Sequence, residues 1–140
     1  MAWATIVKTF RFEAAHQLPN HDGKCARLHG HSYQVEVSIH GPVKPANGDP
    51  DEGMVLDFAR VSEAWKPINA DLDHRYLNDV MDFPTTAENI AGYLADRLGA
   101  ALAPATDRGL VLGVKVYETA TSSAEVRAGV GGPLGVSSAG

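Results

Sequence analysis

The chain of 140 residues is long enough for one domain with a sizeable core, and its 44% hydrophobic and 21% charged residues are typical of a globular protein. Its 12 basic and 17 acidic residues give a formal net charge of -5, which argues against nucleic acid as the main partner. A single cysteine excludes an intrachain disulfide, and neither a membrane span of roughly 18–20 apolar residues nor a signal peptide is visible, so we expect a cytoplasmic protein without a membrane partner.

Two strands are predicted near the N-terminus, at residues 5–16 and 31–41, because apolar and polar side chains alternate in both segments. His16 closes the apolar face of the first strand, and His31 opens the apolar face of the second. We expect the two strands to pair as a long antiparallel ribbon.

Two helices are predicted next. Asp57 is a suitable N-cap for the first, whose apolar stripe recurs every three or four residues up to Leu72. Pro67 falls inside this segment and is expected to kink or interrupt the helix. The second helix opens at Thr85-Thr86-Ala87-Glu88, which fits a capping box.

Two further strands are predicted at residues 110–118 and 121–127. The order strand, strand, helix, helix, strand, strand predicts an α+β domain, with a four-stranded antiparallel sheet and both helices on one face. We assign residues 1–128 to this single domain. Residues 129–140 contain five glycines and no charged side chain, and we expect them to form a flexible tail.

Three histidines are predicted to meet on the inner side of the first strand pair. His29 and His31 are two residues apart, so on one extended segment their side chains project the same way. If the two strands pair antiparallel, His16 at the end of the first lies beside them. Three neutral imidazoles suit Zn²⁺ and leave a fourth position for water or substrate, whereas the alternative is that these are ordinary core or surface histidines.

Cys25 lies four residues before His29, and its spacing leaves three roles open. It is a fourth ligand in a closed Cys-His₃ structural site, an inert thiol, or a reactive thiolate. The flanking Lys24 and Arg27 favour the thiolate.

Two carboxylates are candidates for chemistry. Asp73 can orient the adjacent His74 for a proton relay, although two polar residues at a helix terminus are the alternative. Glu118 ends the apolar face of the third strand, where an unpaired carboxylate is costly. Its partner is an internal Lys or Arg, or a guanidine-like ligand group with two N–H donors.

Five motifs along residues 5–128 together resemble the 6-pyruvoyltetrahydropterin synthase / 6-carboxytetrahydropterin synthase family. They are Phe12-Glu13-Ala14-Ala15-His16, Cys25-x3-His29-Gly30-His31, Leu72-Asp73-His74-x2-Leu77-Asn78, Thr86-Ala87-Glu88-Asn89 and Val116-Tyr117-Glu118-Thr119. The spacing from Cys25 to the His-Gly-His motif resembles the 6-carboxytetrahydropterin synthase branch of queuosine and 7-deazapurine biosynthesis.

The resemblance implies the tunnelling fold, assembled as trimers that stack into a hexamer with active sites between subunits. It also implies that zinc is bound by His16, His29 and His31 and that Cys25 transfers a proton.

By the same resemblance, Asp73 and His74 complete the proton relay from a neighbouring chain. Glu118 anchors the pterin ring, and Thr86 is a further substrate contact.

The activity implied is a zinc-dependent lyase reaction. It converts 7,8-dihydroneopterin triphosphate to 6-carboxy-5,6,7,8-tetrahydropterin and releases acetaldehyde and triphosphate. The alternatives are a 6-pyruvoyltetrahydropterin synthase, which stops after triphosphate elimination and internal redox, and a non-catalytic Cys-His₃ zinc module.

Overall fold

The computed structural model describes residues 2–103 and 109–130. The four strands and two long helices predicted from the sequence are all present, with ends that differ by no more than two residues. β5 continues to Gly129, and the predicted tail lies outside the described residues from residue 131 on. In chain order the elements are β1 (Trp3–His16), η1 (Lys24–Ala26), β2 (His29–Pro42), α1 (Phe58–Leu72), β3 (Arg75–Tyr76), α2 (Leu77–Val80), α3 (Ala87–Leu102), β4 (Val111–Thr119) and β5 (Ser122–Gly129).

The sheet has five strands in the order β3-β1-β2-β4-β5. Neighbouring strands run antiparallel, except that β3 pairs parallel with β1. The prediction of a four-stranded antiparallel sheet is therefore corrected by one short parallel edge strand. Because β3 consists of only two residues, it cannot display the alternation by which strands are recognised in a sequence.

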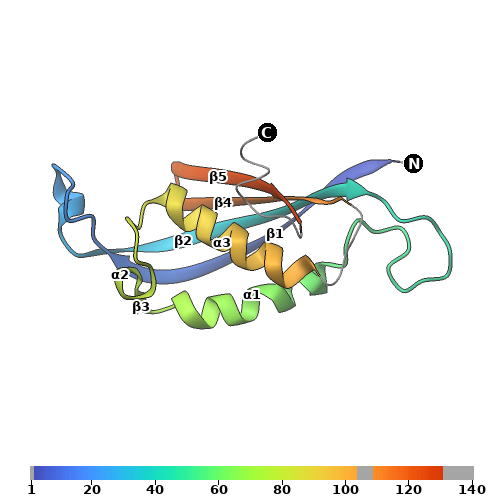
Figure 1. The fold of residues 1–140 in the computed structure, drawn as a ribbon, viewed down its shortest axis with the longest axis horizontal. Helices are drawn as coiled ribbons and strands as arrows, with labels where there is room; N and C mark the ends of the chain where they lie inside the picture. Colours follow the sequence, from blue (N-terminus) through green and yellow to red (C-terminus); the bar gives the residue numbers. More distant parts are fainter. Residues whose placement is uncertain (1, 104–108, 131–140) are drawn as a thin grey trace.

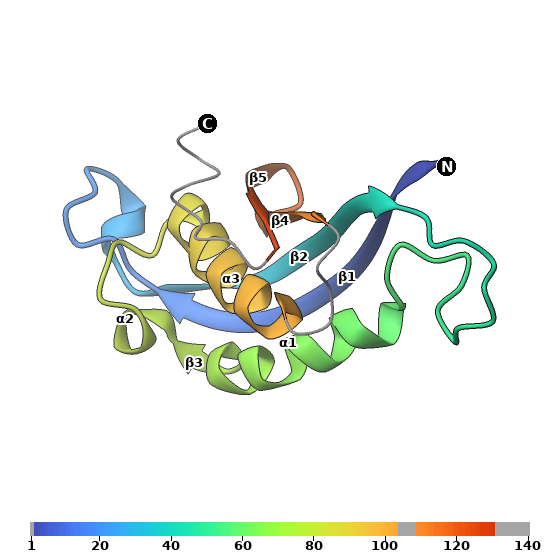
Figure 2. The same ribbon diagram turned by 45° about the vertical axis from the view of Figure 1, so that its right-hand side comes forward.

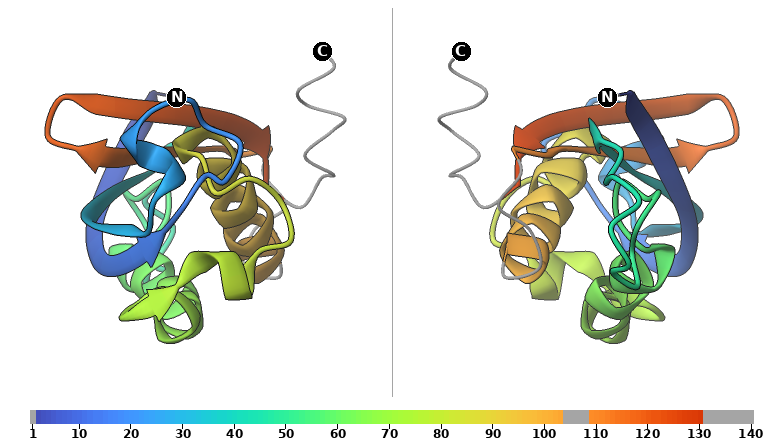
Figure 3. Two further views of the ribbon diagram at one scale, coloured as in Figure 1. Left: turned by 90° about the vertical axis from the view of Figure 1, so that its left-hand side faces the viewer. Right: turned by 90° about the vertical axis from the view of Figure 1, so that its right-hand side faces the viewer.

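α1 and α3 lie on the same face of the sheet, as predicted (Figures 1 and 2). The two end-on views show both helices on the same side of the strands (Figure 3). The α+β class is confirmed, with one layer of helices and one layer of sheet.

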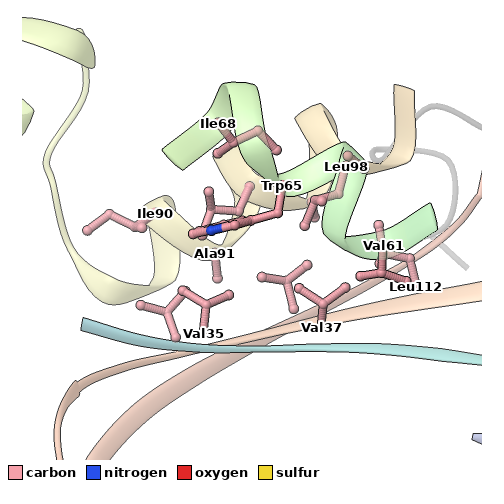
Figure 4. Close-up of a cluster of buried hydrophobic side chains, with 14 of the residues drawn as sticks. Val35, Val37, Val61, Trp65, Ile68, Ile90, Ala91, Leu98 and Leu112 are labelled. Atoms are coloured by element: carbon pink, nitrogen blue, oxygen red, sulfur yellow. The ribbon is translucent and has the colours of Figure 1, made fainter. Parts of the chain in front are cut away.

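A single apolar core fills the space between these layers (Figure 4). Val35 and Val37 of β2 are fully buried. They occupy every second position of the strand, so both side chains point to the face that the helices cover. Trp65 of α1 packs over β1, where its ring stacks on Phe10 with centroids 4.8 Å apart. Burial of this apolar surface holds the helices on the sheet and gives the strand ends a rigid support.

Two local predictions about the helices need correction. Pro67 does not interrupt α1, which runs from Phe58 to Leu72 with this proline inside it. Pro67 is exposed, so the helix hydrogen bond that proline cannot make is lost on the solvent side. The N-cap of α3 is Thr86 and not Thr85, since the Thr86 hydroxyl accepts a hydrogen bond from Asn89 N at 3.2 Å. No helix in the described part of the chain is long and apolar enough to cross a membrane.

Candidate active site and metal centre

The end of β1 and the start of β2 bring three histidine rings together. In the antiparallel register His16 lies directly opposite His29, and Ala14 lies opposite His31. The ring centroids are 4.5 Å apart for His16 and His29, 5.1 Å for His16 and His31, and 4.9 Å for His29 and His31. The predicted convergence of the three imidazoles is therefore present in one chain.

Backbone carbonyls determine which ring nitrogens face this cluster. His16 Nδ1 donates to the carbonyl of Thr85 at 2.8 Å, and His29 Nδ1 donates to the carbonyl of Arg27 at 2.7 Å. A carbonyl only accepts, so both Nδ1 atoms carry the proton and the Nε2 atoms of the neutral rings carry a lone pair. The Nε2 atoms of His16, His29 and His31 are all buried without a hydrogen-bond partner.

Glu118, near the end of β4, completes the cluster. Its Oε1 lies 3.0 Å from His31 Nε2 and 3.2 Å from His16 Nε2. One donor atom from each of His16, His29, His31 and Glu118 lies within 4.8 Å of all the others. Within the described residues, Glu118 forms its ion pairs with His16 and His31. None of these pairs involves the internal Lys or Arg that the sequence analysis considered as a partner.

This arrangement fits a divalent metal ion. Burial lowers the pKa of His16 and of His31, which keeps their imidazoles neutral near pH 7. Lone pairs on neutral rings and a carboxylate oxygen repel one another unless a cation lies among them. Imidazole nitrogens with one carboxylate form a donor set that zinc accepts, so the residues present fit the expected metal.

Cys25 is half-buried in η1, on the loop between β1 and β2. The donor cluster found among the described residues has Glu118 as its fourth member and does not include Cys25. A closed Cys-His₃ centre is therefore not what the structure contains. The carbonyl of Cys25 accepts from Leu18 N at 2.8 Å, which ties its loop to the residues that follow β1.

Asp73 and His74 form a separate pair at the edge of the sheet, between α1 and β3. Asp73 Oδ1 accepts from Glu13 N at 2.8 Å, and its Oδ2 lies 3.0 Å from His74 Nδ1. The hydrogen bond from Glu13 N is the largest cause of a lowered pKa at Asp73. The His74 side chain is 78% exposed, and neither residue belongs to the donor cluster of its own chain.

The backbone of His74 adopts an uncommon conformation, with φ at 59°. Its N–H donates to the carbonyl of Glu13 at 2.6 Å, which holds the residue beside β1. A non-glycine residue kept in the left-handed region is a feature often found at functional sites. The fold thus presents this imidazole outward at a fixed place on the sheet edge.

Thr86 lies beside a depression of about 490 Å³ that is also lined by Gln17, His21, Asn78 and Phe83. Asn78 supports this wall by bonding both the N–H and the C=O of Gln17. Its Oδ1 accepts from Gln17 N at 3.0 Å, and its Nδ2 donates to the carbonyl of Gln17 at 2.9 Å. These two bonds fix the chain immediately after His16.

Two buried residues at the site were missed by reading the sequence. Thr85 was taken for part of a helix cap, but its carbonyl orients His16, and no local pattern reports so distant a contact. Tyr33 lies on the same face as His31, and its hydroxyl is buried without a partner among the described residues. Its place two residues after His31 on an alternating strand was a signal that could have found it.

The chain is similar to known proteins along nearly its whole length. Residues 5–129 match the family model described as 6-pyruvoyl tetrahydropterin synthase. A 6-carboxy-5,6,7,8-tetrahydropterin synthase of Synechocystis sp. is 41% identical over 121 residues, which cover 85% of this chain and 89% of the relative. A dihydroneopterin monophosphate aldolase of Pyrococcus furiosus is 36% identical over 95 residues, which cover 68% of this chain and 75% of that protein.

Among solved structures, the 6-pyruvoyl tetrahydropterin synthase of Caenorhabditis elegans superposes with a TM-score of 0.75 at 27% identity, covering 91% of this chain and 97% of that one. This agreement confirms the tunnelling fold that the motifs implied. With a family model matching most of its residues and the same fold in a solved relative, the chain belongs to the 6-pyruvoyl tetrahydropterin synthase family.

Proposed function

We propose that this protein is a zinc-dependent 6-carboxy-5,6,7,8-tetrahydropterin synthase of the queuosine or 7-deazapurine pathway. The observation that carries the proposal is the convergence of three buried, unpartnered Nε2 atoms on a chain that also holds a free thiol in the adjoining loop. The 41% identity to a relative of that name supports the choice of reaction.

His16, His29 and His31 would hold the metal through Nε2. Bound there, zinc supplies Lewis acidity, which lowers the pKa of hydroxyl groups on the substrate side chain. The carbonyls of Thr85 and Arg27 keep two of the rings in the tautomer that this binding needs. The three histidines thus serve to position and polarise the substrate, and proton transfer belongs to other residues.

Cys25 is the proposed proton acceptor. Its loop joins the two strands that carry the histidines, so the thiol is tied to the same end of the sheet. A thiolate that is not a metal ligand is free to take a proton from a carbon of the substrate side chain. Loss of that proton allows triphosphate to leave by elimination.

Asp73 and His74 are the proposed proton shuttle of a neighbouring subunit's site. Asp73 orients the His74 imidazole through Nδ1, which leaves Nε2 to exchange a proton. The outward presentation of His74 at the sheet edge supports a role across an interface, and a hexamer built from two trimers supplies such interfaces. In this arrangement each site takes its metal ligands and thiol from one chain and its shuttle from another.

Glu118 is the proposed anchor of the pterin ring. The amino-pyrimidinone edge of a pterin offers two parallel N–H donors, and a carboxylate accepts both. Glu118 also lines a depression of about 620 Å³ with Arg11, Ser32 and Gln34, which gives a ring access to it. Thr86, which lines the separate depression of about 490 Å³, is proposed as a further substrate contact.

The overall reaction balances with one water. 7,8-Dihydroneopterin triphosphate and water yield 6-carboxy-5,6,7,8-tetrahydropterin, acetaldehyde and triphosphate. Cleavage of the carbon–carbon bond removes two carbons of the side chain as acetaldehyde. The remaining side-chain carbon becomes the carboxylate while the dihydropterin ring is reduced to the tetrahydro level, so no external oxidant or reductant is required.

Product analysis with 7,8-dihydroneopterin triphosphate tests the proposal. Mass spectrometry is expected to find 6-carboxytetrahydropterin, whereas 6-pyruvoyltetrahydropterin would support the pyruvoyl reaction. The similarity to a dihydroneopterin monophosphate aldolase makes dihydroneopterin monophosphate the second substrate to try. A zinc-loaded protein that converts neither compound would contradict the proposal and favour a non-catalytic zinc module.

A further inference from the structure

We infer that Asn78 is a positioning residue of the histidine cluster, which keeps His16 in the tautomer that leaves Nε2 open to a metal ion. Asn78 ends the motif Leu72-Asp73-His74-x2-Leu77-Asn78, and the proposed reaction gives it no task. The inference rests on the metal centre of the proposed function, whereas the tautomer of His16 is a property that is measured without a metal.

Two bonds to Gln17 determine which way the Asn78 amide faces. The N–H of Gln17 only donates, and its nitrogen lies 3.0 Å from Asn78 Oδ1. The carbonyl of Gln17 only accepts, and its oxygen lies 2.9 Å from Asn78 Nδ2. The reversed amide would place donor against donor and acceptor against acceptor. Asn78 Oδ1 is therefore an acceptor held at a fixed place, beside the residue that follows His16.

A chain of hydrogen bonds leads from this acceptor to His16. The Thr85 hydroxyl donates to Asn78 Oδ1 at 3.4 Å, which uses its single proton. The oxygen of the same hydroxyl lies 3.2 Å from His16 Nδ1 and has lone pairs left to offer. His16 Nδ1 must then carry the proton of the neutral ring, in agreement with its 2.8 Å bond to the Thr85 carbonyl. Asn78 thus directs the hydroxyl that faces His16.

Loss of the Asn78 amide would leave the tautomer of His16 undetermined. A Thr85 hydroxyl without this acceptor can turn its proton toward His16 Nδ1, which favours the neutral ring with its proton on Nε2. A ring in that form has no lone pair on the atom that faces the other two histidines. Partners that fix the tautomer of a ligating histidine contribute a factor of roughly 10–100 to metal affinity.

Asn78 also ends a longer attachment of residues 73–78 to the end of β1. This attachment begins at Asp73, whose carboxylate accepts from Glu13 N, and continues through the pairing of β3 with β1. It ends with the two bonds between Asn78 and Gln17. His16 lies inside this stretch and is fully buried, so its backbone is held on the side of β1 that faces away from β2.

Two measurements on the whole protein test the inference. Nitrogen-15 NMR of the imidazole rings in the metal-free protein reports which nitrogen of His16 carries the proton. Competition with a chromophoric chelator gives the dissociation constant of Zn²⁺. Both are measured for the wild type and for Asn78→Ala, with Asn78→Leu, which keeps the volume of the side chain, as a second variant.

Two controls accompany these variants. Asn47→Ala is the matched control, because Asn47 Oδ1 also accepts from a backbone N–H, that of Asp49 at 3.0 Å. It lies in the segment after β2, at the other end of the sheet (Figure 1). Val61→Ala removes buried methyl groups of α1 from the core and so lowers stability without touching the hydrogen bonds of His16 (Figure 4).

Both Asn78 variants are expected to show a mixture of His16 tautomers and to raise the Zn²⁺ dissociation constant about tenfold or more. Asn47→Ala and Val61→Ala should keep the single wild-type tautomer and the wild-type affinity. A wild-type tautomer in the Asn78 variants would overturn the inference. An equal loss of affinity in Val61→Ala would also overturn it, because Asn78 would then act through stability alone.

Thr85→Val tests the path between the two residues. This change removes the hydroxyl and keeps the carbonyl, so His16 should retain the proton on Nδ1. In the Thr85→Val background, Asn78→Ala should no longer mix the tautomers, because the hydroxyl that would turn is gone. A mixture that persists in the double variant would overturn the path through Thr85.

These outcomes are separable from those of the proposed function. A wild type that binds no zinc contradicts the proposed function, and the tautomer of His16 in the metal-free protein then decides the role of Asn78. Zinc binding and formation of the tetrahydropterin product, together with an unchanged tautomer in both Asn78 variants, refute the inference and leave the proposed function standing.

Discussion

His16 Nδ1 donates a hydrogen bond of 2.8 Å to the carbonyl of Thr85, a residue 69 positions later in the chain. The segment before α3 therefore decides which nitrogen of a buried histidine faces the histidine cluster. Thr85 is followed by Thr86, the N-cap of α3, so the start of this helix and the orientation of His16 depend on the same short stretch. Packing of a helix against the sheet is in this way linked to the chemistry of the site.

Loss of the Thr86 cap of α3 should weaken both the stability of the fold and the binding of a metal by the histidine cluster. Thr86→Ala removes the acceptor for Asn89 N and is expected to lower the free energy of unfolding by about 1 kcal/mol, measured by urea denaturation. Thr86→Ser retains a capping hydroxyl and should stay within a few tenths of a kcal/mol of wild type, roughly the scatter among good caps. Equal stability of Thr86→Ala and wild type would mean that the cap does not hold this segment.

The histidine cluster could be predicted because the parity of side chains along a strand is a local property. His16, His29 and His31 occupy inward positions on two strands joined by one loop, and the antiparallel register then brings them together. The contribution of Glu118 to the cluster was beyond local reasoning. β4 reaches the site through its pairing with β2, in which Tyr117 lies opposite Gln34. These two residues are far apart in the sequence, so no local pattern near Glu118 predicts their pairing.

The remaining differences have similar physical causes. β3 is too short to alternate, and its pairing with β1 depends on the left-handed turn at His74. Pro67 was expected to disturb α1, but apolar residues such as Trp65 and Ile68 bury one side of the helix while proline occupies the exposed side. Tertiary packing therefore overrides the local preference of one residue.

Metal binding is predicted to depend on the three inward histidines. A divalent metal ion, with zinc as the expected one, should copurify with the wild type at close to one ion per chain. His31→Ala should lower this content strongly because it removes one of three Nε2 donors. His21→Ala is the matched control, since His21 is exposed and bonded to Gly23 N outside the cluster. Elemental analysis that finds full occupancy in His31→Ala would contradict the assignment.

Tyr33→Phe is predicted to retain or gain stability. The Tyr33 hydroxyl is buried without a partner within the described residues, and burial keeps it neutral by raising its pKa. Removing an unsatisfied buried hydroxyl recovers its desolvation cost, of order 1 kcal/mol. Tyr93→Phe is the control, because the Tyr93 hydroxyl accepts from Arg97 Nη1 at 3.0 Å, and its loss should cost about 0.5–1.5 kcal/mol. A larger loss in Tyr33→Phe than in Tyr93→Phe would show that the hydroxyl has a partner in solution.

Subunits that carry different inactivating substitutions are predicted to complement each other. Cys25→Ala removes the proposed proton acceptor, and His74→Asn removes the imidazole of the shuttle while tolerating the left-handed backbone at this position. Mixed under conditions of subunit exchange, the two inactive proteins should recover part of the activity, and the double variant should recover none. Absence of activity after exchange has been verified by mass spectrometry would count against a site shared between chains.

The most direct test of the account is the stoichiometry of products in the presence and absence of the Cys25 thiol. In the wild type, acetaldehyde and triphosphate should appear together in equal amounts from 7,8-dihydroneopterin triphosphate. Cys25→Ala should release neither product while keeping its zinc and its fold, since the thiol is not among the donors of the metal cluster. Triphosphate without acetaldehyde in the wild type, or turnover that persists in Cys25→Ala, would contradict the proposed reaction.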